Sequence, residues 1–309
     1  MTATKGRPAV WQAKKTLRRR VWEKRTAYVM IAPFTLIFLT FTLVPVVIAM
    51  FFSFTYYNIL QPPQWVGWVN YVKLFFNDEI FLTAVKNTLI FAAVTGPVSY
   101  GLCFIVAWFV NELTPRVRAL MTLLFYAPSL SGTVSIWMIV FSGDSYGYVN
   151  AIGMQLGLIN TPKQWFSDPA LMKTAIIVVV LWSSLGVGFL SFIAGLQNVD
   201  RSLYEAAAID GIKNRYQELW YVTLPSMKGQ LLFSAIMSIT SSFSIGDIVT
   251  QLCGFPSASY AAHTIMNHLS DYGSIRYEMG YACAIATVLF LMMVGTNALV
   301  QRLLSKVGG

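Results

Sequence analysis

Long apolar runs alternate with short polar segments along almost the whole chain, and this spacing predicts helices that cross a membrane. About 20 residues of helix span the hydrocarbon core of a bilayer, and six runs reach that length. Prolines within the runs, at positions 33, 45, 97 and 128, predict kinks or helix ends. The pattern predicts an all-α integral membrane protein with six transmembrane helices, at residues 27–54, 87–110, 119–141, 174–196, 231–254 and 279–304.

The positive charges are distributed unevenly between the predicted loops. If the N-terminus lies inside, 17 of the 22 Lys and Arg residues fall on the cytosolic side and 5 on the other. Cytosolic loops of membrane proteins carry an excess of Lys and Arg, so both termini are predicted to be cytosolic. Residues 1–26 are then a basic cytosolic tail and residues 27–309 the transmembrane domain. The first run is too long for a signal peptide and no cleavage site follows it, so it is predicted to be a retained anchor.

Composition supports the membrane class and argues against several others. Hydrophobic residues make up 56% of the chain and charged residues only 11%, whereas soluble domains average about 25% charged. Nine of the 22 basic residues precede residue 27, so the net charge of +9 does not indicate a nucleic-acid partner. Cys103, Cys253 and Cys283 fall in or beside apolar runs without disulfide or metal-ligand spacing. They are predicted to be small core hydrophobes.

The chain lacks the motifs of the enzyme classes that work at membranes. No Gly-x4-Gly-Lys-Ser/Thr loop is present, so the chain cannot bind ATP phosphates by that route. No Gly-x-Ser-x-Gly nucleophile turn is present either. We therefore expect a protein that is not an enzyme and holds no cofactor or metal of its own.

A polar stretch at 204–225 interrupts the apolar runs on the predicted cytosolic side. Ser202 and Glu205, where this stretch begins, have the spacing of a capping box, which satisfies the free N–H groups where a helix begins. This predicts a helix over about 203–210. Gly211 is expected to end that helix, because glycine adopts the left-handed conformation of a helix C-terminus at little cost.

One further feature of this stretch suggests contact with another protein, and a second predicts where the stretch ends. Ala206 and Ala207 are small enough for the groove of a partner to approach the helix closely. Leu224-Pro225 is predicted to close a second short helix just before the next apolar run. An ordinary amphipathic cytosolic loop would have the same capping spacing.

The stretch resembles the EAA loop of the membrane subunits of binding-protein-dependent ABC importers. That loop reads Glu-Ala-Ala, three residues, glycine, a spacer, an apolar residue, any residue and Leu-Pro; here the spacer has ten residues instead of the usual nine. Asp210 before Gly211 resembles the carbohydrate-importing, maltose-type branch. The resemblance implies a cytosolic loop at 198–230 that couples to an ATPase, through Glu205, Ala206, Ala207, Asp210, Gly211, Leu224 and Pro225.

Other short motifs extend the resemblance over nearly everything after the basic tail, with the core permease region at about 84–304. The family implies a type I importer permease fold and a heterodimer with a second, homologous permease chain. It also implies two cytosolic ATP-binding subunits that hold ATP and Mg, an external solute-binding protein, a carbohydrate substrate and a bacterial cytoplasmic membrane. The motifs are Asn87-Thr88-Leu89, Leu124-Phe125-Tyr126-Ala127-Pro128, Trp165-Phe166-Ser167-Asp168-Pro169, Ala194-Gly195-Leu196-Gln197 and Gly280-Tyr281-Ala282.

Asp247 is the only carboxylate inside a predicted span. A charge at the centre of a membrane helix costs about 2.5–3.5 kcal/mol on insertion scales, so it must face protein, water or substrate. Two interpretations remain open: a residue of the translocation path, or a buried acceptor that ties helices together near the serines at 241–244. His263 and His268 are five residues apart, whereas a helical zinc pair prefers four. We expect them in a solvated loop.

The leading interpretation is a pore-forming permease of an ATP-driven carbohydrate importer. An importer of a non-sugar solute and an ion-coupled secondary transporter are the alternatives. Secondary transporters usually carry several intramembrane ionisable groups and internal repeats, which this sequence does not show. A membrane-embedded hydrolase would need a catalytic constellation that is also missing.

Overall fold

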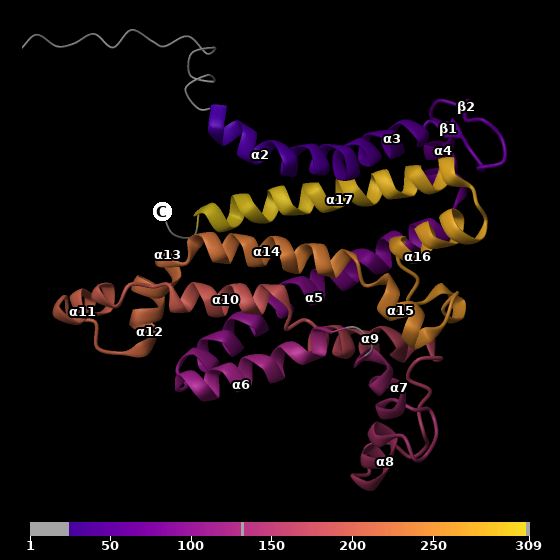
Figure 1. The fold of residues 1–309 in the computed structure, drawn as a ribbon. Helices are drawn as coiled ribbons and strands as arrows, with labels where there is room; N and C mark the ends of the chain where they lie inside the picture. Colours follow the sequence, from indigo (N-terminus) through magenta and orange to yellow (C-terminus); the bar gives the residue numbers. More distant parts are fainter. Residues whose placement is uncertain (1–24, 131–132, 307–309) are drawn as a thin grey trace, which may run out of the picture. The chain divides into compact units, whose positions relative to one another are not determined.

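A computed structural model describes residues 25–130 and 133–306, and it is helical apart from one short hairpin (Figure 1). The chain divides into two compact units, with the boundary between Phe51 and Phe52. Four helical segments of the described chain are long and apolar enough to cross a membrane, and one bent helix pair is a fifth candidate. The basic tail lies almost wholly outside the described residues.

The first unit contains one helical run that is interrupted by a wider turn. α2 (Arg25–Phe38) continues through the π-helical η1 (Leu39–Leu43) into α3 (Val44–Phe52). Pro45 follows η1 by two residues, and proline can neither donate to the carbonyl four residues earlier nor tolerate its close approach. A π turn relieves that clash by widening the helix locally. Pro45 therefore widens the helix but does not end it.

The second unit begins with a small antiparallel hairpin in which β1 (Thr55–Tyr56) pairs with β2 (Gln64–Trp65). α4 (Val69–Val72) and η2 (Lys73–Asn77) lead from the hairpin to the long helices.

α5 (Glu79–Asn111) is the central helix of this unit. It begins eight residues earlier than the predicted span, because the side chain of Asp78 accepts a hydrogen bond from the N–H of Phe81 at 2.9 Å and caps it. The helix contributes buried residues to all three hydrophobic clusters: Phe81 and Ala84 to one, Phe91 to the second, and Cys103, Ala107 and Val110 to the third.

α10 (Val187–Gln197) and α14 (Lys228–Phe243) pack against each other and against α5. Small residues allow this close approach, as in other membrane helix interfaces. A side chain at Gly195 would come within 2.7 Å of the Met227 side chain, and Ser234 donates to the carbonyl of Gly188 at 3.1 Å. α17 (Met279–Lys306) packs on α14 and agrees with the sixth predicted span.

Three of the predicted spans are broken rather than continuous. In the third, α6 (Pro115–Tyr126) ends in the 3₁₀ turn η3 (Ala127–Ser129), because Pro128 lacks the N–H that would continue the helix. η4 (Thr133–Ser135) and α7 (Ile136–Val140) follow. The predicted span over 119–141 is therefore divided at Pro128, where the sequence predicts a kink or a helix end.

The fourth and fifth predicted spans are each divided into two helices. α9 (Pro169–Ser183) stops three residues before α10 begins. α14 stops two residues before α15 (Gly246–Cys253), and the two helices meet at a bend of 40°. Gly254, with φ of +73°, ends α15.

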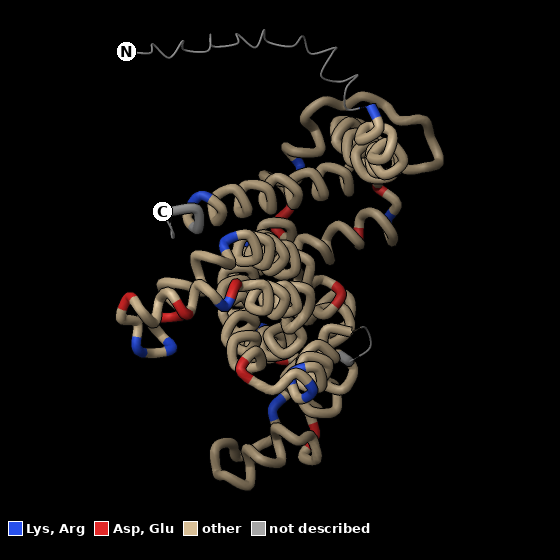
Figure 2. Tube along the Cα trace, turned by 60° about the vertical axis from the view of Figure 1, so that its left-hand side comes forward, with Lys and Arg blue, Asp and Glu red and all other residues tan. Residues whose placement is uncertain are grey.

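The remaining elements are short and lie at the ends of the long helices. Figure 2 shows the charged residues gathered at these ends, whereas the central parts of the long helices are almost uncharged. On one side, α11 (Arg201–Ile209) and α12 (Arg215–Glu218) project beyond the ends of α10 and α14 (Figure 1). The others are α8 (Tyr148–Gln155), η5 (Leu219–Thr223), α13 (Leu224–Ser226), η6 (Ala258–Tyr260), α16 (Ile265–Ser270) and η7 (Asp271–Ile275).

Candidate functional site

α11 is the helix predicted within the cytosolic segment, but its N-terminus is capped differently. The side chain of Asp200 accepts a hydrogen bond from the N–H of Ser202 at 3.0 Å, and this bond holds the pKa of that carboxyl below its usual range. The predicted capping box of Ser202 and Glu205 is therefore wrong. Aspartate caps a helix as well as serine does, so the chain enters the helix two residues earlier than expected.

Gly211 ends α11 in the way the sequence predicts. Its φ is +93°, and no atom lies within 4 Å of where its Cβ would be. Its N–H donates to the carbonyl of Ala208 at 3.3 Å, and the N–H of Ile212 donates to that of Ala207 at 3.0 Å. These two bonds form a Schellman motif. The backbone angle, and not lack of space, requires glycine here.

The two alanines of the motif face in different directions. Ala207 is only 7% exposed, because α11 packs on η5 through the face that Ala207 shares with Tyr204, whose hydroxyl lies 2.9 Å from Oγ1 of Thr223. The prediction that a partner approaches Ala207 is therefore wrong. Ala206 is exposed, and Ile209 is 87% exposed.

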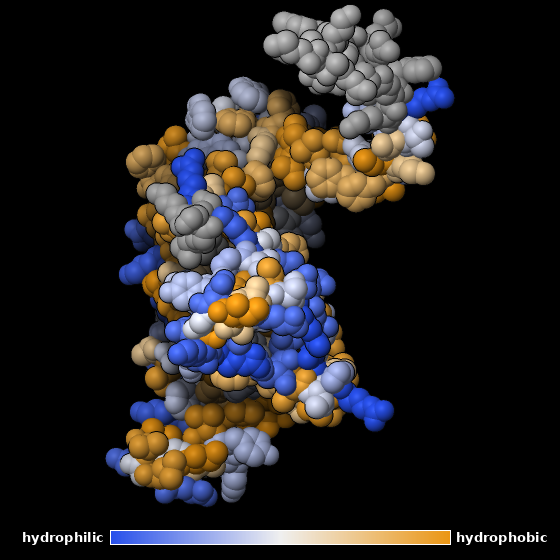
Figure 3. Space-filling model, turned by 90° about the vertical axis from the view of Figure 1, so that its left-hand side faces the viewer, coloured by the Kyte–Doolittle hydropathy of each residue, from blue (hydrophilic) through white to orange (hydrophobic). Residues whose placement is uncertain are grey.

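The outward surface of α11 combines polar and apolar side chains. Glu205 and Asp210 are exposed, and Glu205 does not cap its own helix, since Asp200 does so. Figure 3 faces this end of the molecule and shows a small hydrophobic patch within a hydrophilic surface. A helix that exposes an apolar patch within a polar rim is typical of a surface that binds another protein.

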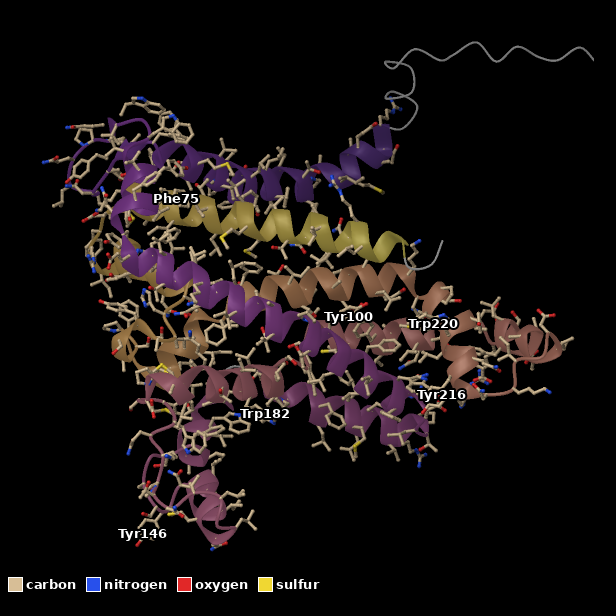
Figure 4. All side chains as sticks on the ribbon, turned by 180° about the vertical axis from the view of Figure 1, so that it is seen from behind. Phe75, Tyr100, Tyr146, Trp182, Tyr216 and Trp220 are labelled. Carbon is tan, nitrogen blue, oxygen red and sulfur yellow. The ribbon has the colours of Figure 1, made fainter. Side chains whose placement is uncertain are left out.

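The second short helix extends slightly beyond Leu224-Pro225. α12, η5 and α13 form one helical run that ends at Ser226, and η5 is a π turn two residues before Pro225, as η1 is before Pro45. Leu224 and Pro225 do not lie on α11. They border a separate apolar groove of about 440 Å³ together with Tyr100 and Trp220, which Figure 4 labels.

A second candidate site is a cavity of about 350 Å³ where the broken helices meet. Its wall includes the turn after α6, the break between α9 and α10, and the break between α14 and α15. None of the described residues that line it carries a charge. The polar lining consists of hydroxyl side chains, from Thr95, Ser99, Ser129, Ser183, Ser184, Ser238, Ser241, Ser242 and Ser244.

The hydroxyl groups of this cavity remain available to a ligand as acceptors. Ser129, Ser184 and Ser241 each donate their hydrogen to a helix carbonyl at 2.7–2.8 Å. A hydroxyl oxygen keeps acceptor lone pairs after it has donated. The Oγ of Ser183 is buried and has no hydrogen-bond partner among the described residues.

The break between α14 and α15 is held in place by α16. Asn267 donates from its side-chain amide to the carbonyl of Gly246 at 2.9 Å and to Oγ1 of Thr250 at 2.8 Å. The side chain of Met266 would lie within 2.7 Å of a Cβ at Gly246. The bend is therefore fixed by side-chain packing and hydrogen bonds, which keeps the wall of the cavity defined.

Asp247 lies in the first turn of α15. It is close in the sequence to Ile245 and Ile248, which line the cavity, but it does not line the cavity itself. Its side chain is exposed and makes no hydrogen bond within the described chain. The interpretation of Asp247 as a buried acceptor near the serines at 241–244 is therefore wrong. The structure leaves this carboxylate on the surface of the chain, at the end of a helix that borders the cavity.

His263 and His268 are buried, at 2% and 1% exposure, so the prediction of a solvated loop is wrong. Nε2 of His268 lies 3.0 Å from Oδ2 of Asp78, and the hydroxyl of Tyr281 donates to the same oxygen at 2.8 Å. The two histidine rings approach each other at 3.4 Å between Nε2 of His263 and Nδ1 of His268. This network ties α16 and α17 to the start of α5.

Burial governs the protonation of this network. It lowers the pKa of His263 to about 4 and lowers the pKa of His268 as well. Burial alone would raise the pKa of Asp78. Hydrogen bonds from Phe81 and Tyr281 and the proximity of His268 outweigh that effect and lower it. Among the described residues, no group of three or more His, Cys, Asp or Glu side chains is arranged to hold a metal ion.

The structural roles of several residues are not predicted from the sequence. Asn87 donates from its amide to the carbonyls of Tyr260 and His263, at 3.1 and 2.9 Å, and so satisfies the backbone of a buried loop. Asp78 followed by Glu79 was a readable signal for a helix start. No sequence signal links Glu112 to Arg215, which form an ion pair across 103 residues.

Residues 100–308 match the family model described as binding-protein-dependent transport system inner membrane component. The chain is 30% identical to the probable ABC transporter permease protein YesP of Bacillus subtilis over 280 residues, which cover 88% of each chain. It is 30% identical to the arabinooligosaccharides transport system permease protein AraP of the same species, with 91% of this chain and 89% of AraP covered.

The lactose transport system permease protein LacF of Rhizobium radiobacter is 32% identical, with 74% of this chain and 76% of LacF covered. Among solved structures, a chain of a bacterial ABC transporter involved in the import of the acidic polysaccharide alginate superposes with a TM-score of 0.71. It is 22% identical, with 93% of this chain and 99% of that chain covered. This likeness shows the fold.

Proposed function

The chain belongs to the binding-protein-dependent transport system inner membrane components, the permease subunits of ABC importers, and we propose that it forms part of the pore of an ATP-driven oligosaccharide importer. In this proposal a second, homologous permease completes the pore, two cytosolic ATPase subunits supply the energy, and an external binding protein delivers the substrate. The complex resides in a bacterial cytoplasmic membrane.

The proposal for the substrate rests on the hydroxyl-lined cavity where the broken helices meet. Sugars are neutral and rich in hydroxyl groups, which donate hydrogen bonds to acceptors such as serine oxygens. The cavity offers a series of such acceptors and, among its described residues, no charge that would select an ion. Discontinuous helices also build the substrate sites of many other transporters. Relatives named for arabinooligosaccharides and lactose agree with this substrate class.

The proposed topology has six spans with both termini in the cytosol. Four long helical segments, one of them made of α9 and α10, and the bent pair of α14 and α15 supply five spans. The run from α6 to α7 would be the sixth, crossing the membrane as two shorter helices on either side of the turn at Pro128. This arrangement puts α11 on the cytosolic side, where it can reach an ATPase.

We propose that α11 is the element that docks on the ATPase. Its exposed face presents Ala206 and Ile209 as the apolar contacts, and Glu205 as a charge for a basic residue of the ATPase. The Schellman motif at Gly211 fixes the direction in which the chain leaves the docked helix.

Replacement of Gly211 by glutamate tests this function. The substitution forces a side chain onto a residue with φ of +93° and should abolish both association with the ATPase and ATP hydrolysis stimulated by the sugar-loaded binding protein. Gly157→Glu is the matched control, because Gly157 also has a positive φ and open space around its Cβ but lies on the opposite side of the membrane in the proposed topology.

Arabino-oligosaccharides, lactose and alginate oligosaccharides, each loaded on the binding protein, are the substrate panel. Stimulation by at least one neutral sugar is the expected result. Intact ATPase association in the Gly211→Glu variant would refute α11 as the docking element, and failure of every sugar to stimulate hydrolysis would refute the substrate class.

A further inference from the structure

We infer that Arg215 is a positioning residue that transmits movement of the docked helix α11 to the central helix α5, through its ion pair with Glu112. The inference rests on the proposed function, because it assumes that α11 receives the movement of an ATPase. It concerns a different contact, however, one that lies inside the chain and not at the ATPase surface.

Arg215 and Tyr216 are neighbours in α12, and both contact α5. Nη2 of Arg215 pairs with Oε2 of Glu112, while Nη1 is held by Glu218 of its own helix at 2.9 Å. The ring of Tyr216 contacts that of Trp108, with centroids 6.0 Å apart. Trp108 and Glu112 are four residues apart, so they share one face of α5. Figure 4 shows Tyr216 at the base of the projecting segment.

The position of Glu112 explains why it needs a cation. Glu112 is the C-cap of α5, and a negative charge is unfavourable at the C-terminal end of a helix dipole. Arg118 is close, but its Nη2 donates to the carbonyls of Asn111 and Leu113, at 2.7 and 3.1 Å. Within the described chain, Arg215 is the cation that pairs with the Glu112 carboxylate.

A polar cavity of about 440 Å³ lies between this end of α5 and the projecting segment that α11 and α12 form. Its lining includes Asn111 and Glu112 of α5 and Arg201 and Tyr204 of α11. The segment is therefore not close-packed against the end of α5, and the contacts of Arg215 and Tyr216 connect the two across the cavity. The side chains of Arg215 and Glu112 are 62% and 40% exposed, so their pairing adds little to folding stability.

α5 leads directly from this contact to the hydroxyl-lined cavity. Thr95 and Ser99 line that cavity from α5, and the helix runs without a break from there to Asn111. A helix moves as a stiff body over such a distance, so a displacement at Glu112 reaches Ser99. The Arg215–Glu112 pair thus connects the ATPase side of the molecule to the substrate cavity.

The experiment uses the assembled complex and a cysteine at Ser99 as the reporter. Cys253 and Cys283 are replaced by serine, and buried Cys103 is retained. The rate of labelling by a small methanethiosulfonate is measured without nucleotide and with ATP plus vanadate. We expect ATP to change this rate in the parent chain. Arg215→Glu should reduce that change by at least about fivefold, the lower end of usual coupling between sites, while the ATPase subunits stay bound.

A charge swap and a matched control separate this role from a general effect of charge. The double variant Glu112→Arg with Arg215→Glu restores the pair in reverse and should restore the ATP-dependent change. Arg116→Glu makes the same change of charge at an exposed position near Glu112 and should have no effect.

Three results would overturn the inference. They are an undiminished response in Arg215→Glu, a loss that the charge swap does not restore, and a loss that is accompanied by dissociation of the ATPase. If ATP does not change the labelling rate in the parent chain, that result would instead contradict the proposed function, and this inference with it.

Discussion

At the scale of single residues, the most informative group is the buried network of Asp78, His263, His268 and Tyr281. Asp78 lies 190 residues from His268 and 203 residues from Tyr281 in the sequence, and hydrogen bonds at 2.8–3.4 Å connect the four side chains. A buried polar network stabilises a fold only when its members are satisfied. The network therefore makes the junction of α5, α16 and α17 sensitive to protonation.

The free energy of unfolding should fall as the pH decreases through the range in which His263 titrates. Histidine in the unfolded chain has a pKa of about 6.5, and the folded pKa of His263 is about 4. Between these values the unfolded chain binds more protons, so the free energy of unfolding drops by roughly 3 kcal/mol from pH 6.5 to pH 4. The lowered pKa of Asp78 acts in the same direction but below this range.

Thermal unfolding of the solubilised chain at pH 5 and pH 7.5 checks this. The melting temperature should be lower at pH 5 than at pH 7.5, and His263→Gln should reduce this difference in melting temperature. Values at pH 7.5 and pH 8.5 should agree, because neither histidine titrates there. An unchanged difference in the His263→Gln variant would contradict the assignment.

At the scale of elements, α11 shows how closely spaced capping signals compete. Asp200, Ser202 and Glu205 are all suitable for a helix N-terminus, and the structure uses Asp200. The cap sets where the helix begins, and packing on η5 leaves Ala206 and Ile209 outward while Ala207 is covered.

The cap of α11 can be tested by two alanine substitutions. Asp200→Ala removes the side-chain acceptor of the Ser202 N–H and should speed amide hydrogen exchange in the first turn of α11 severalfold, because that turn then frays. Ser202→Ala keeps the acceptor and should leave exchange nearly unchanged. The reverse order of effects would restore the capping box of Ser202 and Glu205.

At the scale of the whole molecule, the chain presents surfaces that it does not complete itself. Asp247 stands exposed at the start of α15, next to residues that line the hydroxyl cavity. An exposed carboxylate at membrane depth is costly unless water, a substrate or another protein meets it. We expect the second permease and the substrate path to supply that environment.

Asp247→Asn is expected to reduce transport by about tenfold, the effect of losing one charge-assisted hydrogen bond, and to leave the assembly intact. Sugar uptake by the reconstituted complex and co-purification of the subunits are the two measurements. If the variant fails to assemble, Asp247 belongs to the contact between the permeases and not to the path.

The sequence alone determined the membrane class, most of the apolar spans and the position of the projecting helix α11. These follow from local properties: the length of an apolar run, the bias of charge between loops, and the conformation that Gly211 permits. The spacing of Ser202 and Glu205 predicts the start of α11 to within two residues, and the wider family resemblance agrees with the matched region at 100–308.

Only the tertiary structure decided the features that depend on distant residues. A hydropathy run does not show where a helix breaks. Pro128 predicts the end of α6, but the breaks between α9 and α10 and between α14 and α15 are not predicted. His268 lies against Asp78 at the start of α5, which also binds Tyr281 of α17, and His263 contacts His268. The pairing of Arg215 with Glu112, and the outward position of Asp247, are likewise set by how helices pack, which no local pattern of side chains records.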